Sequence, residues 1–178
     1  MHSQSIGTKL VRQNSVVIVD YFGERLLAFW NAPPEIHDHA SMAVKCAMNI
    51  QDDLAAAGQA WEAMLERPLQ AGIGIATGPA HVGNCGSPQR IKYGPHEGSV
   101  NLAVRLEQLA KRLAMPIVIS ELTAEHISID FLSRRICKVR VKGFCQALNI
   151  YEPLAENSEM VNPGSQELLK QFSNEVAL

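Results

Sequence analysis

The segment at residues 100–113 constrains the fold most, because it carries two parallel stripes with the period of an α-helix. Its apolar stripe recurs every three or four residues and consists of Leu102, Leu106, Leu109 and Leu113. A helix with one apolar face has to bury that face against another layer of structure. We therefore predict a helix here that packs on a sheet and keeps its polar stripe at the edge of the contact.

Short apolar runs and helical periods alternate before this segment. The β-branched run at 15–20 and the apolar run at 25–30 flank a turn that contains Gly23, which predicts a β-hairpin. Residues 37–57 have apolar positions at helical spacing and predict a helix. The remaining stretch predicts a strand at 69–76, a return strand at 80–82, and a loop over the Gly-, Pro- and Asn-rich residues 83–99.

The residues after the central helix predict more strands and one short helix. Three strands are expected at 117–119, 133–141 and 147–152, and Ser120 is placed to cap a helix over 121–127. Hairpins and helices in this order are typical of a mixed α/β (α+β) fold. We expect an antiparallel-rich sheet with helices on one face.

Composition bounds the class of protein. The 178 residues correspond to about one domain, and a net charge of −2 does not favour nucleic acid or anionic lipid as a general partner. No apolar run approaches the ~18 residues of a membrane span. Four cysteines without a C-x-x-C pair favour neither a disulfide framework nor a zinc site. These features predict a cytoplasmic protein with reduced thiols and no membrane segment.

The polar stripe of the central helix is the first candidate for chemistry. Asn101, Arg105, Gln108 and Arg112 recur at spacings of four, three and four, which puts Asn101 and Arg105 about 5–6 Å apart at Cβ. An amide beside a guanidinium suits a sugar oxygen and a phosphate group. The alternative is an ordinary solvated helix face.

The expected hairpin supplies the second candidate. Asp20 precedes its turn, and Gly23 and Glu24 form its tip. Two carboxylates near a tight turn could hold Mg²⁺ together with a triphosphate. The alternative is a polar turn without a ligand, because turns favour such residues.

Taken together, these segments resemble the catalytic domain of class III adenylyl/guanylyl cyclases. The matching stretches are VDYFGERLLAFWNAP at 19–33, GIGIATG at 72–78, VGN at 82–84, YGP at 93–95, VNLAVRLE at 100–107 and VKG at 141–143. The VNLAVRLE string is the most specific of them. The resemblance covers residues 15–153 and implies the ferredoxin-like sandwich of nucleotidyl cyclases.

The resemblance also implies an activity. The family converts ATP or GTP to a 3′,5′-cyclic nucleotide and pyrophosphate in intracellular signalling, with two Mg²⁺ or Mn²⁺ ions on the phosphates. Its domains pair head to tail, as a homodimer or as a heterodimer with another cyclase domain. Asn101 would orient the ribose, Arg105 would stabilise charge on phosphate in the transition state, and Glu24 would take the place of a metal-binding aspartate.

The nucleotide itself is expected beside Asp20, Gly23 and Gly94. Asp20 stands where adenylyl cyclases usually carry the lysine that reads adenine, and Gly94 stands where they carry Asp or Thr. A carboxylate at position 20 cannot donate to adenine but can accept from the N1–H and amino group of guanine. This favours GTP, with loss of base recognition as the alternative.

The sequence departs from the family at its beginning. The family's first metal-binding aspartate lies on an N-terminal strand that has no counterpart here, so the two-metal site is expected to be incomplete. We predict an N-terminally truncated cyclase domain, with a remnant helix or linker at 1–14, the cyclase homology domain at 15–153 and a tail at 154–178. The alternative function is a catalytically silent cyclase-homology module that binds a partner cyclase domain.

Overall fold

The computed structural model describes residues 17–22, 25–61, 71–87, 90–96 and 98–156. The expected N-terminal remnant and most of the expected tail lie outside these residues. The described elements follow one another as β1 (Val17–Phe22), β2 (Arg25–Phe29), α2 (His39–Trp61), β3 (Ile73–Ile75), β4 (His81–Ser87), β5 (Arg90–His96), α3 (Gly98–Arg112), β6 (Ile117–Ser120), α4 (Glu121–His126), β7 (Phe131–Val139) and β8 (Leu148–Glu156).

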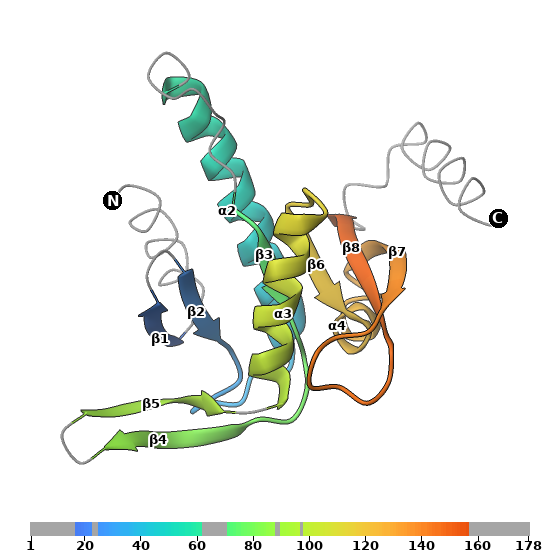
Figure 1. The fold of residues 1–178 in the computed structure, drawn as a ribbon. Helices are drawn as coiled ribbons and strands as arrows, with labels where there is room; N and C mark the ends of the chain where they lie inside the picture. Colours follow the sequence, from blue (N-terminus) through green and yellow to red (C-terminus); the bar gives the residue numbers. More distant parts are fainter. Residues whose placement is uncertain (1–16, 23–24, 62–70, 88–89, 97, 157–178) are drawn as a thin grey trace.

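The main sheet has four strands in the order β3-β6-β8-β7. β3 and β6 are parallel, whereas β8 pairs antiparallel with both β6 and β7. Parallel neighbours need a crossover connection, and the chain makes it through the β4–β5 hairpin and α3 (Figure 1). The expected mixed α/β class with an antiparallel-rich sheet is confirmed.

Helices cover both faces of this sheet rather than one. Ile117 and Ile119 of β6 pack in a core with residues of α2 and α4. Val118, between them, packs with Leu106 and Ala110 of α3. Successive side chains of a strand point to opposite faces, so α3 lies on the face opposite to α2 and α4. The expectation of helices on one face is wrong in this respect, because all four side chains of the β6 strand are buried.

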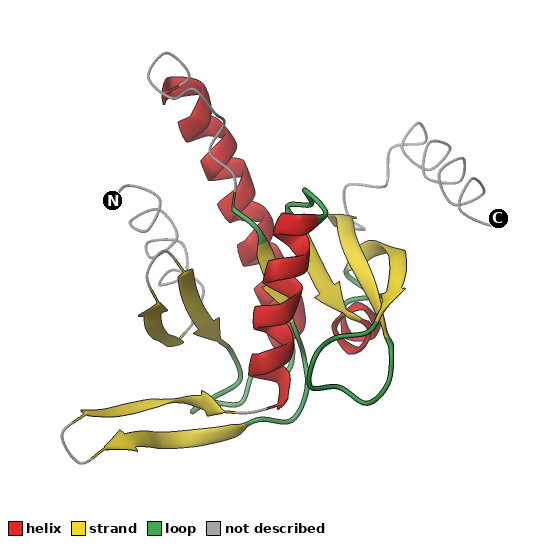
Figure 2. Cartoon of the chain, in the orientation of Figure 1, coloured by secondary structure: helices red, strands yellow, loops and turns green. Residues whose placement is uncertain are grey.

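The stretch that was expected to be a loop forms a two-stranded ribbon. β4 and β5 pair antiparallel from His81 opposite His96 to Ser87 opposite Arg90. The predicted return strand at 80–82 therefore pairs with β5 and not with β3, and the prediction of a loop over 83–99 is wrong. Figures 1 and 2 show the ribbon reaching away from the main sheet, where its glycines need not fill a core.

The predicted N-terminal hairpin is confirmed, and it stands apart from the main sheet. β1 and β2 pair antiparallel, from Val17 opposite Phe29 to Phe22 opposite Arg25. They form their own two-stranded sheet (Figure 2). In the part of the chain that the structure describes, no strand pairs with the outer edge of β3 or joins it to β2.

A buried hydroxyl network joins the end of β3 to α4. Ser120 caps α4 as predicted, with its Oγ accepting from the Thr123 backbone N–H at 3.2 Å. Thr123, which is fully buried, accepts from the Thr77 backbone N–H at 2.9 Å and donates to the Thr77 hydroxyl at 3.0 Å. The network fixes the turn after β3, from which the chain leads into the ribbon and α3.

Replacing Thr123 with valine should lower the free energy of unfolding by about 1–3 kcal/mol, because it leaves the Thr77 N–H without its acceptor at nearly constant volume. Urea denaturation of both proteins measures this difference. Ser128→Ala is the control, since Ser128 is exposed and its hydroxyl donates to the nearby Glu125 carbonyl. Equal stability of Thr123→Val and wild type would show that the network does not stabilise the fold.

Candidate active site

The position of α3 depends on Gly74 at the middle of β3. A Cβ atom on this residue would overlap the backbone N of Glu107 and the backbone O of Ala103, and would lie 2.8 Å from the backbone C of Leu106. The helix backbone therefore rests directly on the strand, closer than any other residue type would permit. This contact sets the depth at which the polar stripe of α3 sits above the sheet.

The first turn of α3 is fastened to the turn after β3. The Ser99 hydroxyl donates to the Pro79 carbonyl at 3.3 Å. Gly98 begins the helix with φ of +39°, and a Cβ there would lie 3.1 Å from the same carbonyl oxygen. The hydrogen bond holds the N-terminal end of α3, where Asn101 lies, against the turn after β3, and the absence of a side chain at Gly98 permits this close approach.

The structure confirms that Asn101 and Arg105 share one helix, one turn apart. Asn101 is exposed, and Arg105 is half-buried. The Arg105 Nη1 atom donates to Oε1 of Gln108 at 3.1 Å. Among the described residues, the partner that the guanidinium contacts is thus a neutral amide rather than a carboxylate.

Glu107 ties α3 to the N-terminal hairpin. Its carboxylate is only 15% exposed and lies 2.7 Å from Lys111 Nζ and 3.6 Å from Arg25 Nε. Arg25 begins β2 and follows Glu24, the predicted metal ligand, in the sequence. The two cations offset the negative charge of Glu107. The sequence contains no signal for the ion pair of Arg25 with Glu107, because the two residues come from distant segments.

A second contact joins the hairpin to the ribbon. The ring of Phe29 in β2 lies 6.4 Å from that of Tyr93 in β5, between centroids. Gly94, which follows Tyr93, is buried and pairs with Gly83. The structure therefore brings β2, β5 and α3 together, and these elements carry Gly94, Asn101 and Arg105.

The roles of all the predicted site residues, Asn101, Arg105 and Gly94 included, stay predictions. The backbone of Asp20 lies in β1 opposite Leu27, while Gly23 and Glu24 lie outside the described residues. Within the described ranges, no group of three or more His, Cys, Asp or Glu residues is placed to hold a metal ion.

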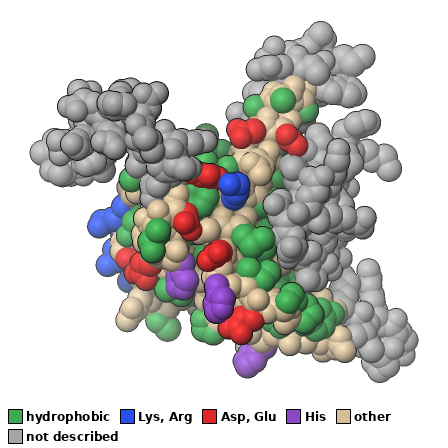
Figure 3. All heavy atoms as spheres, turned by 180° about the vertical axis from the view of Figure 1, so that it is seen from behind, with side chains coloured by type: hydrophobic (Ala, Val, Ile, Leu, Met, Phe, Trp, Pro, Cys, Tyr) green, Lys and Arg blue, Asp and Glu red, His purple; other side chains and the backbone are tan. Residues whose placement is uncertain are grey.

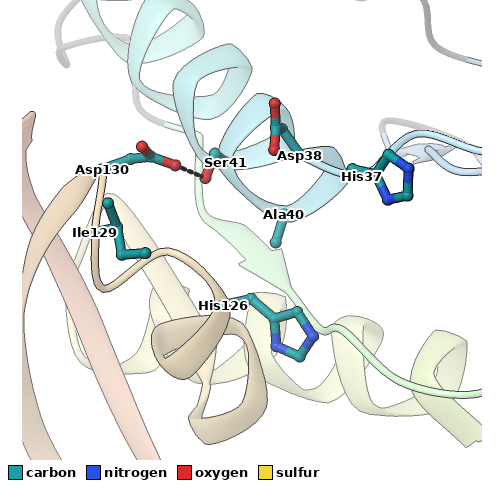
Figure 4. Close-up of a pocket in the computed structure, with 7 residues that line it drawn as sticks. All are labelled: His37, Asp38, Ala40, Ser41, His126, Ile129 and Asp130. Atoms are coloured by element: carbon teal, nitrogen blue, oxygen red, sulfur yellow. Dashed lines mark hydrogen bonds between the residues drawn. The ribbon is translucent and has the colours of Figure 1, made fainter.

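A cavity of about 260 Å³ lies elsewhere, between α2, α4 and the start of β7. It is lined by His37, Asp38, Ala40, Ser41, His126, Ile129 and Asp130. Figure 3 shows histidine and acidic side chains gathered on this face, and Figure 4 shows the hydrogen bond from Ser41 to Asp130 at the cavity wall. Because α2 and α4 lie across the sheet from α3, this cavity is separate from Arg105.

Comparisons with known proteins identify the fold and the motif. The family model described as the adenylate and guanylate cyclase catalytic domain matches residues 5–152, and the chain belongs to this family. It is similar to adenylate cyclase 1 of Rhizobium meliloti (strain 1021), with 30% identity over 145 residues, 82% of this chain and 22% of the relative. The chain thus spans less than a quarter of that relative.

Solved structures agree with this assignment. The adenylyl cyclase CyaB from P. aeruginosa has a TM-score of 0.77 to this chain at 26% identity, with 86% of this chain and 79% of that chain covered. The guanylyl cyclase Cya2 has a TM-score of 0.74 at 28% identity, with 86% and 77% covered. The predicted resemblance is therefore confirmed. None of the described helices is both long and apolar enough to cross a membrane.

Proposed function

We propose that this chain is a nucleotidyl cyclase domain that forms a 3′,5′-cyclic nucleotide and pyrophosphate from ATP or GTP. The observation that carries the proposal is the pair on α3: an exposed amide, Asn101, one turn from Arg105, whose contact is with a neutral group. An amide suits the ribose, and a guanidinium with its charge uncompensated suits a phosphate.

In the proposed reaction, the ribose 3′-hydroxyl oxygen attacks the α-phosphorus and the pyrophosphate leaves. The hydroxyl loses its proton as the new P–O bond forms. Arg105 stabilises the negative charge that grows on the phosphate oxygens, and Asn101 holds the ribose so that the hydroxyl faces the phosphorus. Preorganised donors of this kind lower the barrier because they need no reorientation as charge develops.

The family generally uses divalent metal ions, and Glu24 is the residue of this chain proposed to contribute to such a site. When bound, the ions would supply charge neutralisation for the phosphates. In the proposed assembly, each active site combines residues of two cyclase domains in a head-to-tail dimer, with either a second copy of this chain or another cyclase domain as the partner.

A catalytically silent module that binds a partner cyclase is the second candidate. The observation in its favour is the gap in pairing: in the described part of the chain, β1 and β2 share no backbone ladder with β3. The carboxylate at position 24 also belongs to a glutamate, which is longer by one methylene than the aspartate of the family. Either difference would weaken control over the reacting phosphate.

The test is an assay of the purified chain with ATP and with GTP in the presence of Mn²⁺, in which the cyclic product is quantified by chromatography. We expect product from at least one nucleotide, with GTP preferred if Asp20 reads the base. Calorimetry then measures triphosphate binding. Absence of both product and binding would rule out the enzyme, and the silent module would be supported if the chain stimulated an added cyclase domain.

A further inference from the structure

Gln108 is a polar residue of α3 that the family motif does not explain, since the VNLAVRLE match ends at Glu107. Its side-chain Oε1 accepts a hydrogen bond from Arg105 Nη1 at 3.1 Å, and both residues are partly buried. Residues three apart on a helix face the same side, so this contact stays within the polar stripe. We infer that Gln108 is a positioning residue that holds the Arg105 guanidinium in the orientation needed for phosphate. This inference rests on the proposed cyclase function.

The partner of Arg105 is a neutral amide, and this chemistry matters as much for phosphate binding as the hydrogen bond itself. An arginine side chain has several rotatable bonds, and a hydrogen bond that fixes one Nη atom limits the orientations of the whole planar group. A carboxylate would fix it equally well but would also cancel most of its charge. An amide oxygen orients the guanidinium and leaves the positive charge, with its remaining N–H donors, for an anionic ligand.

The charged residues near Arg105 support a role for Gln108 in orienting the guanidinium without neutralising it. The nearest acidic residue in the helix sequence, Glu107, is already paired with Lys111 at 2.7 Å and with Arg25 at 3.6 Å. Within the described residues, no ion pair to Arg105 is formed. As far as the described residues go, the helix therefore carries an ion-paired Glu107 beside an Arg105 whose charge no carboxylate compensates, and Gln108 is the group that holds this cation.

A double-mutant cycle on the purified chain tests the role. Gln108→Ala should lower kcat by about tenfold with KM changed less than about twofold, as expected for loss of one hydrogen bond to a charged group. In an Arg105→Ala background, the same substitution should have no further effect. A purely structural role for Gln108 would persist in that background and would overturn the inference.

Two further variants sharpen the result. Gln108→Glu keeps an acceptor but introduces a negative charge, so kcat should fall at least as far as in Gln108→Ala; wild-type kcat in this variant would overturn the need for a neutral partner. Gln146→Ala removes an exposed glutamine from the β7–β8 connection and should leave kcat unchanged. Thermal unfolding of each variant verifies that the fold is retained.

A measurement without turnover separates this inference from the proposed function. The ¹⁵N order parameter of the Arg105 Nε–H group should be high in the wild type and should fall in Gln108→Ala but not in Gln146→Ala. An equally mobile guanidinium in the wild type and in Gln108→Ala would overturn the positioning role even in an active enzyme. A wild-type chain with an ordered Arg105 that forms no product would refute the cyclase function alone.

Discussion

Gly74→Ala should lower the free energy of unfolding by about 3 kcal/mol or more, or prevent folding altogether. The added methyl group would overlap backbone atoms of Glu107 and Ala103. Backbone atoms of a helix cannot rotate aside as a flexible side chain can, so α3 would have to move away from the sheet. That movement would open the core formed by Leu106, Ala110, Val118 and Ile150. Soluble yield and thermal unfolding measure the effect.

Gly58→Ala is the matched control for this experiment. Gly58 lies within α2, and a Cβ there would meet no atom within 4 Å. The same chemical change should therefore stabilise the protein by up to about 1 kcal/mol through helix propensity. A lower free energy of unfolding for Gly74→Ala together with a higher one for Gly58→Ala would establish the close contact of α3 with β3. Similar stabilities for both would contradict it.

Arg105→Ala is expected to reduce product formation by a factor of about 100 or more, since it removes the cation proposed to stabilise charge on the phosphate. Arg105→Lys keeps the charge but loses the planar fork, and a loss of about tenfold or more is expected. The melting temperature should change little, because Arg105 is only half-buried and its described hydrogen bond is to Gln108. Initial rates with ATP and GTP measure the effect on the reaction.

Arg112→Ala serves as the control on the same helix. Arg112 is exposed and lies in the last turn of α3, so its removal changes the net charge equally but leaves Arg105 in place. The rate of product formation by Arg112→Ala should remain near that of the wild type. If the two alanine variants lose activity to the same extent, the effect comes from overall charge and the role proposed for Arg105 is wrong.

Helices and packed strands could be predicted from the sequence, whereas their layering could not. The apolar period of α3 and the cap at Ser120 are local features that the structure confirms. The ribbon β4–β5 was missed because its glycines, proline and asparagine resemble a loop, and only pairing with each other makes them strands. The close approach of α3 to β3 depends on Gly74, whose contact with a distant helix has no local signature.

In the candidate site, too, contacts within one helix could be predicted from the sequence, whereas contacts between distant segments could not. Asn101 and Arg105 could be paired in advance because helical spacing alone brings them together. The link from Arg25 to Glu107 joins segments far apart in the chain, and its geometry depends on how the hairpin sits against α3. The roles expected of all the site residues remain predictions, and Gly23 and Glu24 in addition lie outside the described part of the chain.

The separate hairpin sheet is expected to differ from the main sheet in local stability. In the described residues, β1 and β2 are linked to the rest by side-chain contacts such as Arg25 with Glu107 and Phe29 with Tyr93, without a shared backbone ladder. A half-exposed ion pair contributes at most about 1 kcal/mol, so we expect undocking of the hairpin to cost less than unfolding of the core. In the proposed cyclase, apparent substrate affinity would then scale with the docked fraction, and a partner that favours docking would act as an activator.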